Sequence, residues 1–421
     1  MSKIRISKPD KNLEGTITLS GSKSISNRVL IIRALCDESF KISNLSDSDD
    51  TRTLQQLLIS DDAVLDAHHA GTTYRFMTSY LALQNGSRQL TGSARMQERP
   101  IKALVDALSA IGANIEYADK DGYPPLDIHS PSANFEREVS LSASISSQYI
   151  SSLLLVAPTL PSGLTIHLIG DIVSKPYLEM TLRIMEYFGV SHEWSGSSIH
   201  ISAQKYLAKD FFVEADWSAA SYYYIITALS DEADITLKGL RQDSLQGDKA
   251  MADIGVHFGI DTEYLDNAIR IKKGDRVVKP FLEYDFIMCP DIAQSVSTMA
   301  AGSGVSCLFS GLQTLKIKET DRIAALKKEL AKVHVYLSKL PKRFSKNKHV
   351  EYYMQEGDIE GDEMAPTFAT YKDHRMAMSF APLAMLFDIE IEDHLVVTKS
   401  YPSYWEDLKS LGFKIKTVSE S

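Results

Sequence analysis

Hydrophobic and polar positions repeat along this chain in units that each predict a helix, a short strand, a polar loop, a second helix and a further strand. We count six such units. Each opens with a segment rich in small and apolar residues, here called a first-helix segment. The six segments start near Ser24, Thr72, Ser146, Trp217, Asp291 and His374. Most of these starts are Ser, Thr or Asp, or follow Asp directly, and such side chains cap helix N-termini.

Each first-helix segment is followed by a run in which apolar and polar residues alternate, the pattern of a half-buried strand. The six runs read FKISNLS, SRQLTGS, GLTIHLIG, ADITLKGL, VSCLFSGL and IEIEDHLVVT. The second helices carry apolar residues at three- and four-residue spacing. Four of them reach a Gly at the predicted C-terminus, namely LVDALSAIGANIEY, EMTLRIMEYFGVSHEW, MADIGVHFGIDTEY and EDLKSLGFKIKTV. LQQLLISDDAVLDA and AALKKELAKVHVYL follow the same plan without the Gly.

Six repeated α/β units are compatible with a parallel α/β sheet, a closed barrel or two domains of three units. The first-helix segments are apolar along most of their length, which favours helices buried inside and sheets outside. A Rossmann fold or a TIM barrel would instead place near-continuous apolar strands inside amphipathic helices. We therefore predict an α/β protein of two three-unit domains. The polar segment 338–366, which contains KRFSKNK, predicts an exposed loop or hairpin.

Composition and charge narrow the class of protein. The 421 residues are 44% hydrophobic and 24% charged, values that exclude a disordered or collagen-like chain. The formal net charge of −10 argues against binding to the phosphate backbone of a nucleic acid. The longest apolar runs fall far short of the roughly 20 residues that span a bilayer, and the N-terminus shows no secretory signal.

Cysteine and histidine usage gives no indication of a disulfide or a metal. Cys36, Cys289 and Cys307 are odd in number and far apart, and no Cys-x-x-Cys pair occurs, which fits a reducing cytoplasm. The adjacent His68 and His69 diverge in direction and have no third ligand spaced near them. Cysteine and histidine usage therefore predicts a cytoplasmic protein with no metal. We further expect a monomer with no cofactor and with no nucleic-acid or membrane partner.

Positive charge gathers at the predicted helix starts, where unpaired N–H groups and the helix dipole already favour anions. The first helices carry Lys23, Arg28, Arg75 and Arg375 there, and the second helices carry Arg99, Lys175, Lys318, Arg322 and Lys399. Cations are locally unfavourable at these places, so their recurrence in an acidic protein predicts a shared pocket for a multiply anionic ligand. The alternative for each residue is a side chain that points into solvent.

One segment adds a candidate acid or base. KIKETDR, at 316–322, places Glu319 between Lys318 and Arg322, and a carboxylate so placed is a candidate general acid or base. The alternative is a surface ladder of salt bridges at i,i+4 spacing. The chain has no GxSxG motif and no cysteine in a Gly-rich loop, which leaves proton transfer and anion binding as the available chemistry.

Nine segments, in order along the chain, resemble the 5-enolpyruvylshikimate-3-phosphate synthase family: GSKSISNR, AGTTYR, RMQERP, SSQY, VSKPY, PDIAQ, KETDR, DHRMAM and KSYPSYW. The match runs from Gly21 to Trp405. Helix capping explains several of these segments when each is taken alone. The resemblance implies a two-domain inside-out α/β barrel, each domain built of three βαβαββ-type repeats. The domains would be 21–213, and 1–20 with 214–421, and the active site would lie in the cleft between them.

The resemblance also implies a reaction. The family transfers the enolpyruvyl (1-carboxyvinyl) group of phosphoenolpyruvate to the 5-hydroxyl of shikimate 3-phosphate and releases phosphate, on the shikimate pathway to chorismate and the aromatic amino acids. By matched position, shikimate 3-phosphate would be bound by Lys23, Ser24, Arg28, Ser146, Ser147, Gln148, Ser174, Asp291 and Lys318. Phosphoenolpyruvate would be bound by Lys23, Gly71, Arg99, Gln148, Arg322, Arg375 and Lys399. The implied catalytic residues are Lys23, Asp291, which would take up the 5-hydroxyl proton, and Glu319, which would protonate the methylene carbon.

The chain departs from the family pattern in places. His69 stands where Asn is usual, Thr314 stands where an Asn often contacts the shikimate side, and segment 338–366 is atypical. Gly71 keeps the space that herbicide-insensitive relatives fill with Ala, so we expect competitive inhibition by glyphosate. One rival interpretation is the related transferase acting on UDP-N-acetylglucosamine, whose reactive Cys is missing from SARMQERP. Another is a non-catalytic anion-binding relative.

Overall fold

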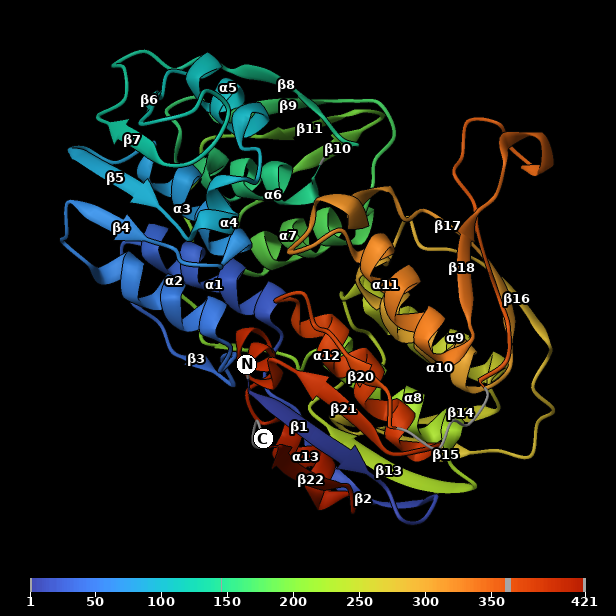
Figure 1. Ribbon diagram of the computed structural model, residues 1–421. Coiled ribbons are helices and arrows are strands. Elements are labelled where there is room, and N and C mark those ends of the chain that lie inside the picture. The colour runs from blue at the N-terminus through green and yellow to red at the C-terminus, as the bar shows by residue number, and fades with distance from the viewer. Residues whose placement is uncertain (1, 145, 360–364, 419–421) are drawn as a thin grey trace. The chain divides into compact units, whose positions relative to one another are not determined.

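The computed structural model describes residues 2–144, 146–359 and 365–418 (Figure 1). The chain divides into two compact units. We call Gly21–Val213 the continuous unit, and Met1–Ser20 with Glu214–Ser421 the split unit. Each unit has a hydrophobic core of its own, so each encloses its own set of buried helices.

Six helices occupy the predicted first-helix segments. In the continuous unit they are α1 (Lys23–Leu35), α3 (Gly71–Leu81) and α6 (Ser147–Val156), and in the split unit they are α8 (Trp217–Leu229), α10 (Ala293–Gly302) and α12 (His374–Phe380). They are buried nearly all round. Every residue of α8 except Ser218 is buried, and so is every residue of α6 except Gln148. The prediction of buried helices is confirmed, and the two exceptions are polar residues in the first helical turn.

The predicted second helices are present as well. They are α2 (Asp49–Ile59), α5 (Lys102–Ala110), α7 (Lys175–Tyr187), α9 (Ala250–His257), α11 (Arg322–Leu330) and α13 (Tyr404–Ser410). Just beyond four of them lie Gly112, Gly189, Gly259 and Gly412, with φ of +108°, +86°, +75° and +88°. Glycine adopts this left-handed backbone without a steric penalty, which explains its place there. A short helix that the sequence did not predict, α4 (Ala94–Gln97), precedes Arg99.

Within the described ranges the strands form six small sheets, five of which share one pattern. Each of the five has four strands, joined by one parallel pairing and then two antiparallel pairings. The sixth sheet, in the continuous unit, has only a parallel pair, β3 (Ile42–Ser43) with β12 (Phe211–Phe212). Five of the six predicted units thus share one sheet topology, and the sixth unit has a parallel pair in its place.

In the continuous unit the four-stranded sheets are β4 (Val64–Asp66), β5 (Ser87–Thr91), β7 (Leu126–His129) and β6 (Asn114–Tyr117), and β8 (Glu138–Ser142), β9 (Leu164–Ile169), β11 (Ser198–Ile201) and β10 (Glu193–Ser195). In the split unit they are β2 (Asn12–Thr18), β13 (Glu232–Lys238), β15 (Ala268–Lys273) and β14 (Ile260–Leu265); β16 (Phe281–Asp285), β17 (Ser306–Ser310), β19 (Tyr353–Glu356) and β18 (Tyr336–Lys339); and β20 (Thr367–Phe368), β21 (Ile389–Glu392), β1 (Lys3–Ser7) and β22 (Lys414–Val418).

Each strand turns one set of alternate side chains toward the helices. In β9, Leu164, Ile166 and Leu168 are buried in the same hydrophobic core as α6, whereas Thr165 and His167 are partly exposed. Such alternation places the helices on the inner face of the sheet. In the split unit, β1 pairs with both β21 and β22, and β2 pairs with β13. Residues 1–20 therefore complete two sheets whose other strands come from much later in the chain.

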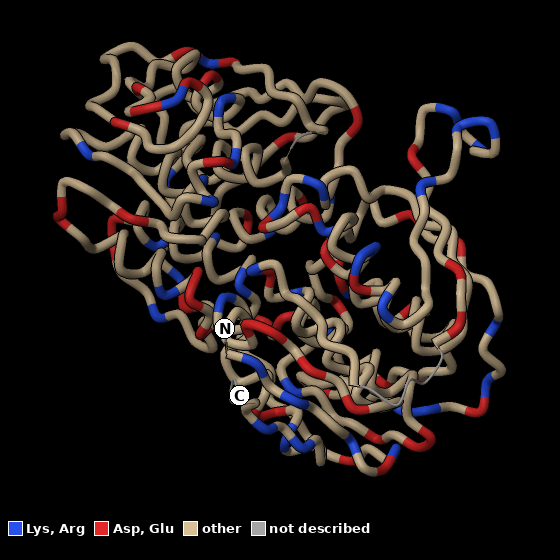
Figure 2. The backbone as a smooth tube through the Cα atoms, viewed as in Figure 1, with Lys and Arg blue, Asp and Glu red and all other residues tan. Residues whose placement is uncertain are grey.

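The polar segment 338–366 is a hairpin as far as residue 359, which confirms its prediction, while residues 360–364 lie outside the described ranges. β18 and β19 pair in antiparallel fashion, and Lys316 and Lys339 both form ion pairs with Glu351 at the base of the connection. Figure 2 shows Lys and Arg gathered on this projecting arm.

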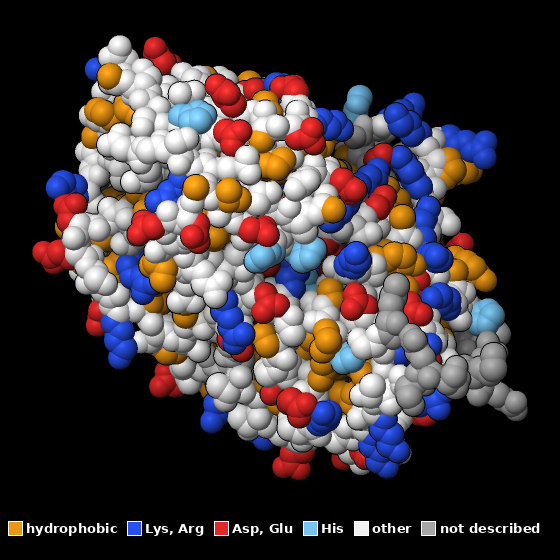
Figure 3. Space-filling model, turned by 60° about the vertical axis from the view of Figure 1, so that its left-hand side comes forward, with side chains coloured by type: hydrophobic (Ala, Val, Ile, Leu, Met, Phe, Trp, Pro, Cys, Tyr) orange, Lys and Arg blue, Asp and Glu red, His pale blue; other side chains and the backbone are white. Residues whose placement is uncertain are grey.

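Over much of the face drawn in Figure 3, charges of both signs are intermingled. Among the described residues, no helix is both long and apolar enough to cross a membrane.

Candidate active site

A connected set of charges in the split unit centres on Arg322, the first residue of α11. Arg322 is 1% exposed, and its guanidinium contacts three carboxylates. Nε lies 2.7 Å from Asp373 Oδ2, Nη2 lies 2.9 Å from Glu319 Oε2, and Nη1 lies 3.2 Å from Asp291 Oδ1. Burial alone would lower the pKa of Arg322, but attraction to Asp373 and Glu319 outweighs it, and the pKa is raised. Arg322 therefore remains cationic and holds three acids around it.

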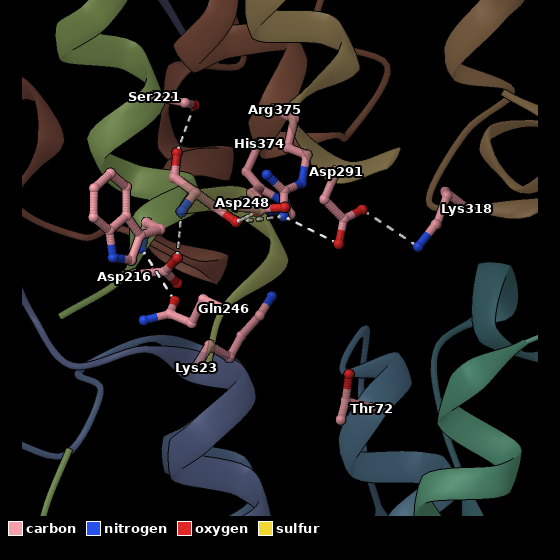
Figure 4. A network of polar contacts seen from close by, with 12 residues as sticks. Lys23, Thr72, Asp216, Ser221, Gln246, Asp248, Asp291, Lys318, His374 and Arg375 are labelled. Carbon is pink, nitrogen blue, oxygen red and sulfur yellow. Dashed lines mark hydrogen bonds and ion pairs between the residues drawn. The ribbon is translucent and has the colours of Figure 1, made fainter. Parts of the chain in front are cut away.

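The two predicted catalytic carboxylates also contact further cations. Glu319 Oε1 lies 3.1 Å from Lys399 Nζ. Asp291 Oδ1 lies 3.3 Å from Lys318 Nζ, and its Oδ2 lies 3.5 Å from Arg375 Nη2 (Figure 4). The structure thus joins the six predicted site residues of this unit in one network of ion pairs. They are Asp291, Lys318, Glu319, Arg322, Arg375 and Lys399.

Local structure places these side chains at the ends of helical segments. Lys318 is extended and follows the short 3-10 helix Gln313–Ile317, and Asp321 caps α11 by accepting hydrogen bonds from the N–H groups of Ile323 and Ala324. Because Lys318 precedes the helix and Arg322 is buried, the alternative of a surface salt-bridge ladder is wrong. Burial lowers the pKa of Lys318, and the charge of Asp291 offsets part of this effect.

Asp373 is a member of this network that the sequence did not single out. It is fully buried, caps α12 by accepting a hydrogen bond of 2.9 Å from the N–H of Arg375, and pairs with Arg322. The two preceding residues, Tyr371 and Lys372, have φ of +54° and +57°, an unfavourable backbone for residues with side chains. The Tyr371 hydroxyl donates a 2.5 Å hydrogen bond to Glu329 Oε1, which ties this strained turn to α11.

In the continuous unit, Lys23 opens α1 and its Nζ lies 3.1 Å from Asp50 Oδ2. Asp50 is 4% exposed and lies in the first turn of α2, behind the Ser48 cap. Its backbone carbonyl accepts a 2.8 Å hydrogen bond from the Thr73 hydroxyl in α3. Asp50 therefore links the starts of three helices. Sequence reasoning missed it, although the acidic run SDSDD at 46–50 was visible.

Arg28, one turn into α1, has a different environment from Arg322. Its guanidinium is buried and donates to Thr181 Oγ1 at 2.7 Å, to the Ser24 carbonyl at 2.8 Å and to Ser151 Oγ at 3.1 Å. The structure gives it no carboxylate partner among the described residues. Burial lowers its pKa to about 10. The continuous unit therefore holds a buried cation with neutral partners, which favours an anionic ligand nearby.

The start of α3 brings together three more predicted residues of the continuous unit. Gln148 Nε2 donates a 3.0 Å hydrogen bond to Thr72 Oγ1. A Cβ atom added at Gly71 would lie 2.5 Å from Arg99 Nη1 and 2.8 Å from Arg75 Nη1. The absent side chain of Gly71 therefore leaves room for two guanidinium groups at a helix N-terminus.

The remaining predicted residues lie at other helix starts. Ser146 caps α6 by accepting from the N–H of Gln148, Ser147 is buried behind it, and Ser174 precedes α7 with φ of +58°. Ser24 is in the first turn of α1 and gives its carbonyl to Arg28. By contrast, Lys175 is half exposed and pairs with Glu179 on the same helix, so solvent exposure is the correct interpretation for it.

Two positions that depart from the family pattern also have defined surroundings. His69 Nδ1 lies 2.7 Å from Ser93 Oγ, which holds the turn before α3. The hydroxyl oxygen of Thr314, a residue 8% exposed, is buried and has no hydrogen-bond partner among the described residues.

Solved structures of other proteins share the fold of this chain. The EPSP synthase of Acinetobacter baumannii aligns with a TM-score of 0.77 at 19% identity, covering 100% of both chains. The enolpyruvyl transferase NikO of Streptomyces tendae aligns with a TM-score of 0.74 at 15% identity, covering 100% of this chain and 99% of the other. The fold is that of the enolpyruvyl transferases, and the predicted fold class is confirmed.

Sequence comparison identifies the family within that class. The family model described as EPSP synthase (3-phosphoshikimate 1-carboxyvinyltransferase) matches residues 7–60 and 54–408. The 3-phosphoshikimate 1-carboxyvinyltransferase of Bacteroides fragilis is 45% identical over 410 residues, which are 97% of this chain and 98% of that protein. The protein of the same name from Actinobacillus succinogenes is 33% identical over 455 residues, covering 98% of this chain and all of the other. The chain belongs to the EPSP synthase family, as the nine segments predicted.

Proposed function

We propose that this protein transfers the enolpyruvyl group of phosphoenolpyruvate to the 5-hydroxyl of shikimate 3-phosphate, with release of phosphate. The observation that carries the proposal is the network in which Arg322 contacts both Glu319 and Asp291 while Lys318, Arg375 and Lys399 surround the two acids. Family membership supports the same reaction. The product feeds the shikimate pathway to chorismate and the aromatic amino acids.

The two substrates differ in their charged groups and hydroxyl groups, so we assign each of them its own set of residues. We assign shikimate 3-phosphate to Lys23, Ser24, Arg28, Ser146, Ser147, Gln148, Ser174, Asp291 and Lys318. We assign phosphoenolpyruvate to Lys23, Gly71, Arg99, Gln148, Arg322, Arg375 and Lys399. Guanidinium groups bind phosphate and carboxylate in a two-pronged manner, and such charge-assisted hydrogen bonds contribute about 1.5–3 kcal/mol each. The buried, carboxylate-free Arg28 fits an anionic group of the first substrate.

Glu319 and Asp291 have complementary roles in the proposed chemistry. Glu319 gives a proton to the methylene carbon of phosphoenolpyruvate, and the neighbouring carbon develops cationic character. The 5-hydroxyl oxygen bonds to that carbon while Asp291 takes up the hydroxyl proton, which yields a tetrahedral intermediate. The Glu319 carboxylate then takes back a methyl proton, the C–O bond to phosphate breaks, and the double bond forms again on the product. A positioned acid and base of this kind each contribute about 10²–10⁴-fold to rate.

Residues of both units are needed for this assignment, and we propose that the two units are domains that close on the substrates. The two substrates together carry two phosphates and two carboxylates, which repel one another until cations surround them. Closure driven by those anions would exclude water from the oxocarbenium-like centre and align the reacting atoms. We propose further that the enzyme works as a monomer in the cytoplasm.

Release of inorganic phosphate tests the proposed function directly. We expect purified protein to release phosphate when shikimate 3-phosphate and phosphoenolpyruvate are both present, and none when either is omitted. Replacement of shikimate 3-phosphate by UDP-N-acetylglucosamine distinguishes the proposed reaction from that of the rival transferase. If the protein were that transferase, phosphate would be released only with the nucleotide sugar. Absence of phosphate with both acceptors would contradict the proposal and favour a non-catalytic anion-binding protein.

Gly71→Ala is expected to weaken phosphoenolpyruvate binding and glyphosate inhibition together. The added Cβ would lie within 3 Å of the Arg99 and Arg75 guanidinium groups, and both side chains are less than one-tenth exposed, so they have little room to shift. Overpacking of this kind costs about 1–3 kcal/mol, which corresponds to a rise of roughly 5- to 150-fold in KM for phosphoenolpyruvate. Steady-state kinetics with glyphosate as a competitor should show a larger rise in its inhibition constant, whereas KM for shikimate 3-phosphate should change little. Unchanged glyphosate inhibition would contradict this assignment of Gly71.

A further inference from the structure

The segment 246–248 holds the start of α8 from outside the helix (Figure 4). Gln246 Oε1 accepts a 3.1 Å hydrogen bond from the N–H of Trp217, and its Nε2 donates a 2.7 Å hydrogen bond to the carbonyl of Ala215. Asp216 caps the helix by accepting from the N–H of Ser218 at 2.8 Å. The backbone of Ser218 is thereby fixed, so the position of its side-chain oxygen is set as well.

The Ser218 hydroxyl links two charged side chains. It donates a hydrogen bond to Asp248 Oδ2 and accepts one of 3.3 Å from Arg375 Nη2. A hydroxyl has one hydrogen, so when that hydrogen points to Asp248 only lone pairs remain for Arg375. Arg375 Nη2 also lies 3.5 Å from Asp291 Oδ2, so Ser218 and Asp291 both contact its guanidinium.

The buried position of Asp248 is energetically unfavourable for a carboxylate. It is 3% exposed, and its second oxygen, Oδ1, is buried without a hydrogen-bond partner among the described residues. A buried carboxylate with an unsatisfied oxygen destabilises a fold. The helix does not require it, because Asp216 and Gln246 already satisfy the first N–H groups of α8. A role in orienting Ser218 accounts for an acid at this place.

We propose that Asp248 is a positioning residue for phosphoenolpyruvate, because its ionised carboxylate fixes the Ser218 hydroxyl as a hydrogen-bond acceptor for Arg375. The inference rests on the proposed function, which assigns Arg375 to phosphoenolpyruvate. Asp248 itself contacts Ser218 and acts on the substrate only through Arg375. Loss of this orientation is expected to raise KM for phosphoenolpyruvate more than it lowers kcat.

The charged groups around Asp248 support a transition near neutral pH. Burial raises the pKa of Asp248 to about 7, and the negative charge of Asp291 adds to the shift while Arg375 opposes it. The elements packed here carry further titratable groups. They are Lys249 beside Asp248, Asp216 and Tyr222 to Tyr224 at and within α8, Asp253 and His257 on α9, His374 at the start of α12 and the buried thiol of Cys289. Below about pH 7, Asp248 is protonated and can donate a hydrogen bond to the Ser218 hydroxyl. The hydroxyl hydrogen of Ser218 is then no longer fixed toward Asp248, so it can also point toward Arg375.

The raised pKa of Asp248 also makes the stability of the fold depend on pH. The pKa of Asp248 rises from 3.8 to about 7 on folding, so the folded state binds more protons between these values. The contribution of this group to stability is therefore present below about pH 4 and is lost as pH rises through about 7. Asp248→Asn, which cannot ionise, is expected to gain in melting temperature relative to the unmodified protein as pH rises from 5 to 8.

The test compares Asp248→Asn with the unmodified enzyme by steady-state kinetics between pH 6 and 8.5. The substrate phosphate itself titrates near pH 6, so the measured quantity is the ratio of the two KM values for phosphoenolpyruvate, in which substrate titration cancels. We expect a ratio of about three- to tenfold at pH 8.5 that falls toward one at pH 6. Ser218→Ala should show the same trend, and adding Asp248→Asn to it should change KM no further.

Asp253→Asn, an exposed acid on α9, is the matched control and should behave as the unmodified enzyme. A KM ratio that does not vary with pH, in Asp248→Asn or in Ser218→Ala, overturns the inference. So does a loss of kcat or melting temperature with KM unchanged, which is the result of a merely structural role. If the unmodified enzyme releases no phosphate, the proposed function fails instead, and the two failures are thereby distinguished.

Discussion

Glu319→Gln is expected to lower kcat by about 10²–10⁴-fold while the protein stays folded and binds both substrates. The amide has nearly the same shape as the carboxyl group, but it has one acceptor oxygen in place of two. Because Arg322 and Lys399 contact different oxygens of Glu319, the amide can still accept a hydrogen bond from one of them but not from both. It has no acidic proton to give to the methylene carbon. Since proton transfer to carbon is the step assigned to Glu319, the loss should fall on kcat rather than on KM. Phosphate release under saturating substrates measures it.

A matched control for this result is Glu406→Gln, in which an exposed glutamate of α13 that pairs with Lys409 loses its charge. We expect no change in kcat from that variant. Exchange of solvent deuterium into the methylene group of phosphoenolpyruvate gives a second measurement, because it requires reversible protonation of that carbon. Undiminished phosphate release by Glu319→Gln would show that another group protonates the substrate.

Local pattern was sufficient to predict most of the helices and their ends. The apolar residues of α8 extend around the whole helix, and a helix of that kind must be buried whatever the rest of the chain does. Gly112, Gly189, Gly259 and Gly412 could be placed because a helix end that needs positive φ selects glycine. The FKISNLS run was harder, since its strand is limited to Ile42–Ser43 by a partner of two residues, Phe211–Phe212, far along the chain.

The cations of the site were visible in the sequence, and so were Asp291 and Glu319, but the other acids around them were not. A Lys or Arg at a helix start is locally unfavourable, so its presence there draws attention without knowledge of the fold. An Asp at a helix start is an ordinary cap, which is why Asp50, Asp373 and Asp248 gave no such indication. Their roles depend on partners distant in sequence, as with Arg322 and Asp373, which are 51 residues apart. Only the folded structure shows which acidic side chain pairs with which Lys or Arg.

Arg322→Met is expected to lower the free energy of unfolding by about 3–5 kcal/mol and to abolish activity. Methionine fills much of the same volume, but it leaves Asp373 fully buried without the guanidinium that now contacts both of its oxygens. A buried charge that loses its partner costs far more than the pair contributed, because desolvation is no longer compensated. The midpoint of urea unfolding measures the loss, and Arg276→Met, at a half-exposed ion pair with Asp261, should move it little.

The two effects of Arg322→Met separate in a second variant. If the instability comes from the unpaired Asp373, then Asp373→Asn in the Arg322→Met background removes that charge, keeps a side-chain oxygen to cap α12, and restores a large part of the unfolding midpoint. Activity should not return, because the guanidinium assigned to phosphoenolpyruvate is still missing.

Arg322→Lys should retain more stability than Arg322→Met but bind phosphoenolpyruvate poorly, since an ammonium group cannot bridge three carboxylates and a substrate anion in one plane. An unfolding midpoint for Arg322→Met equal to that of Arg276→Met would mean that the buried network does not stabilise the split unit.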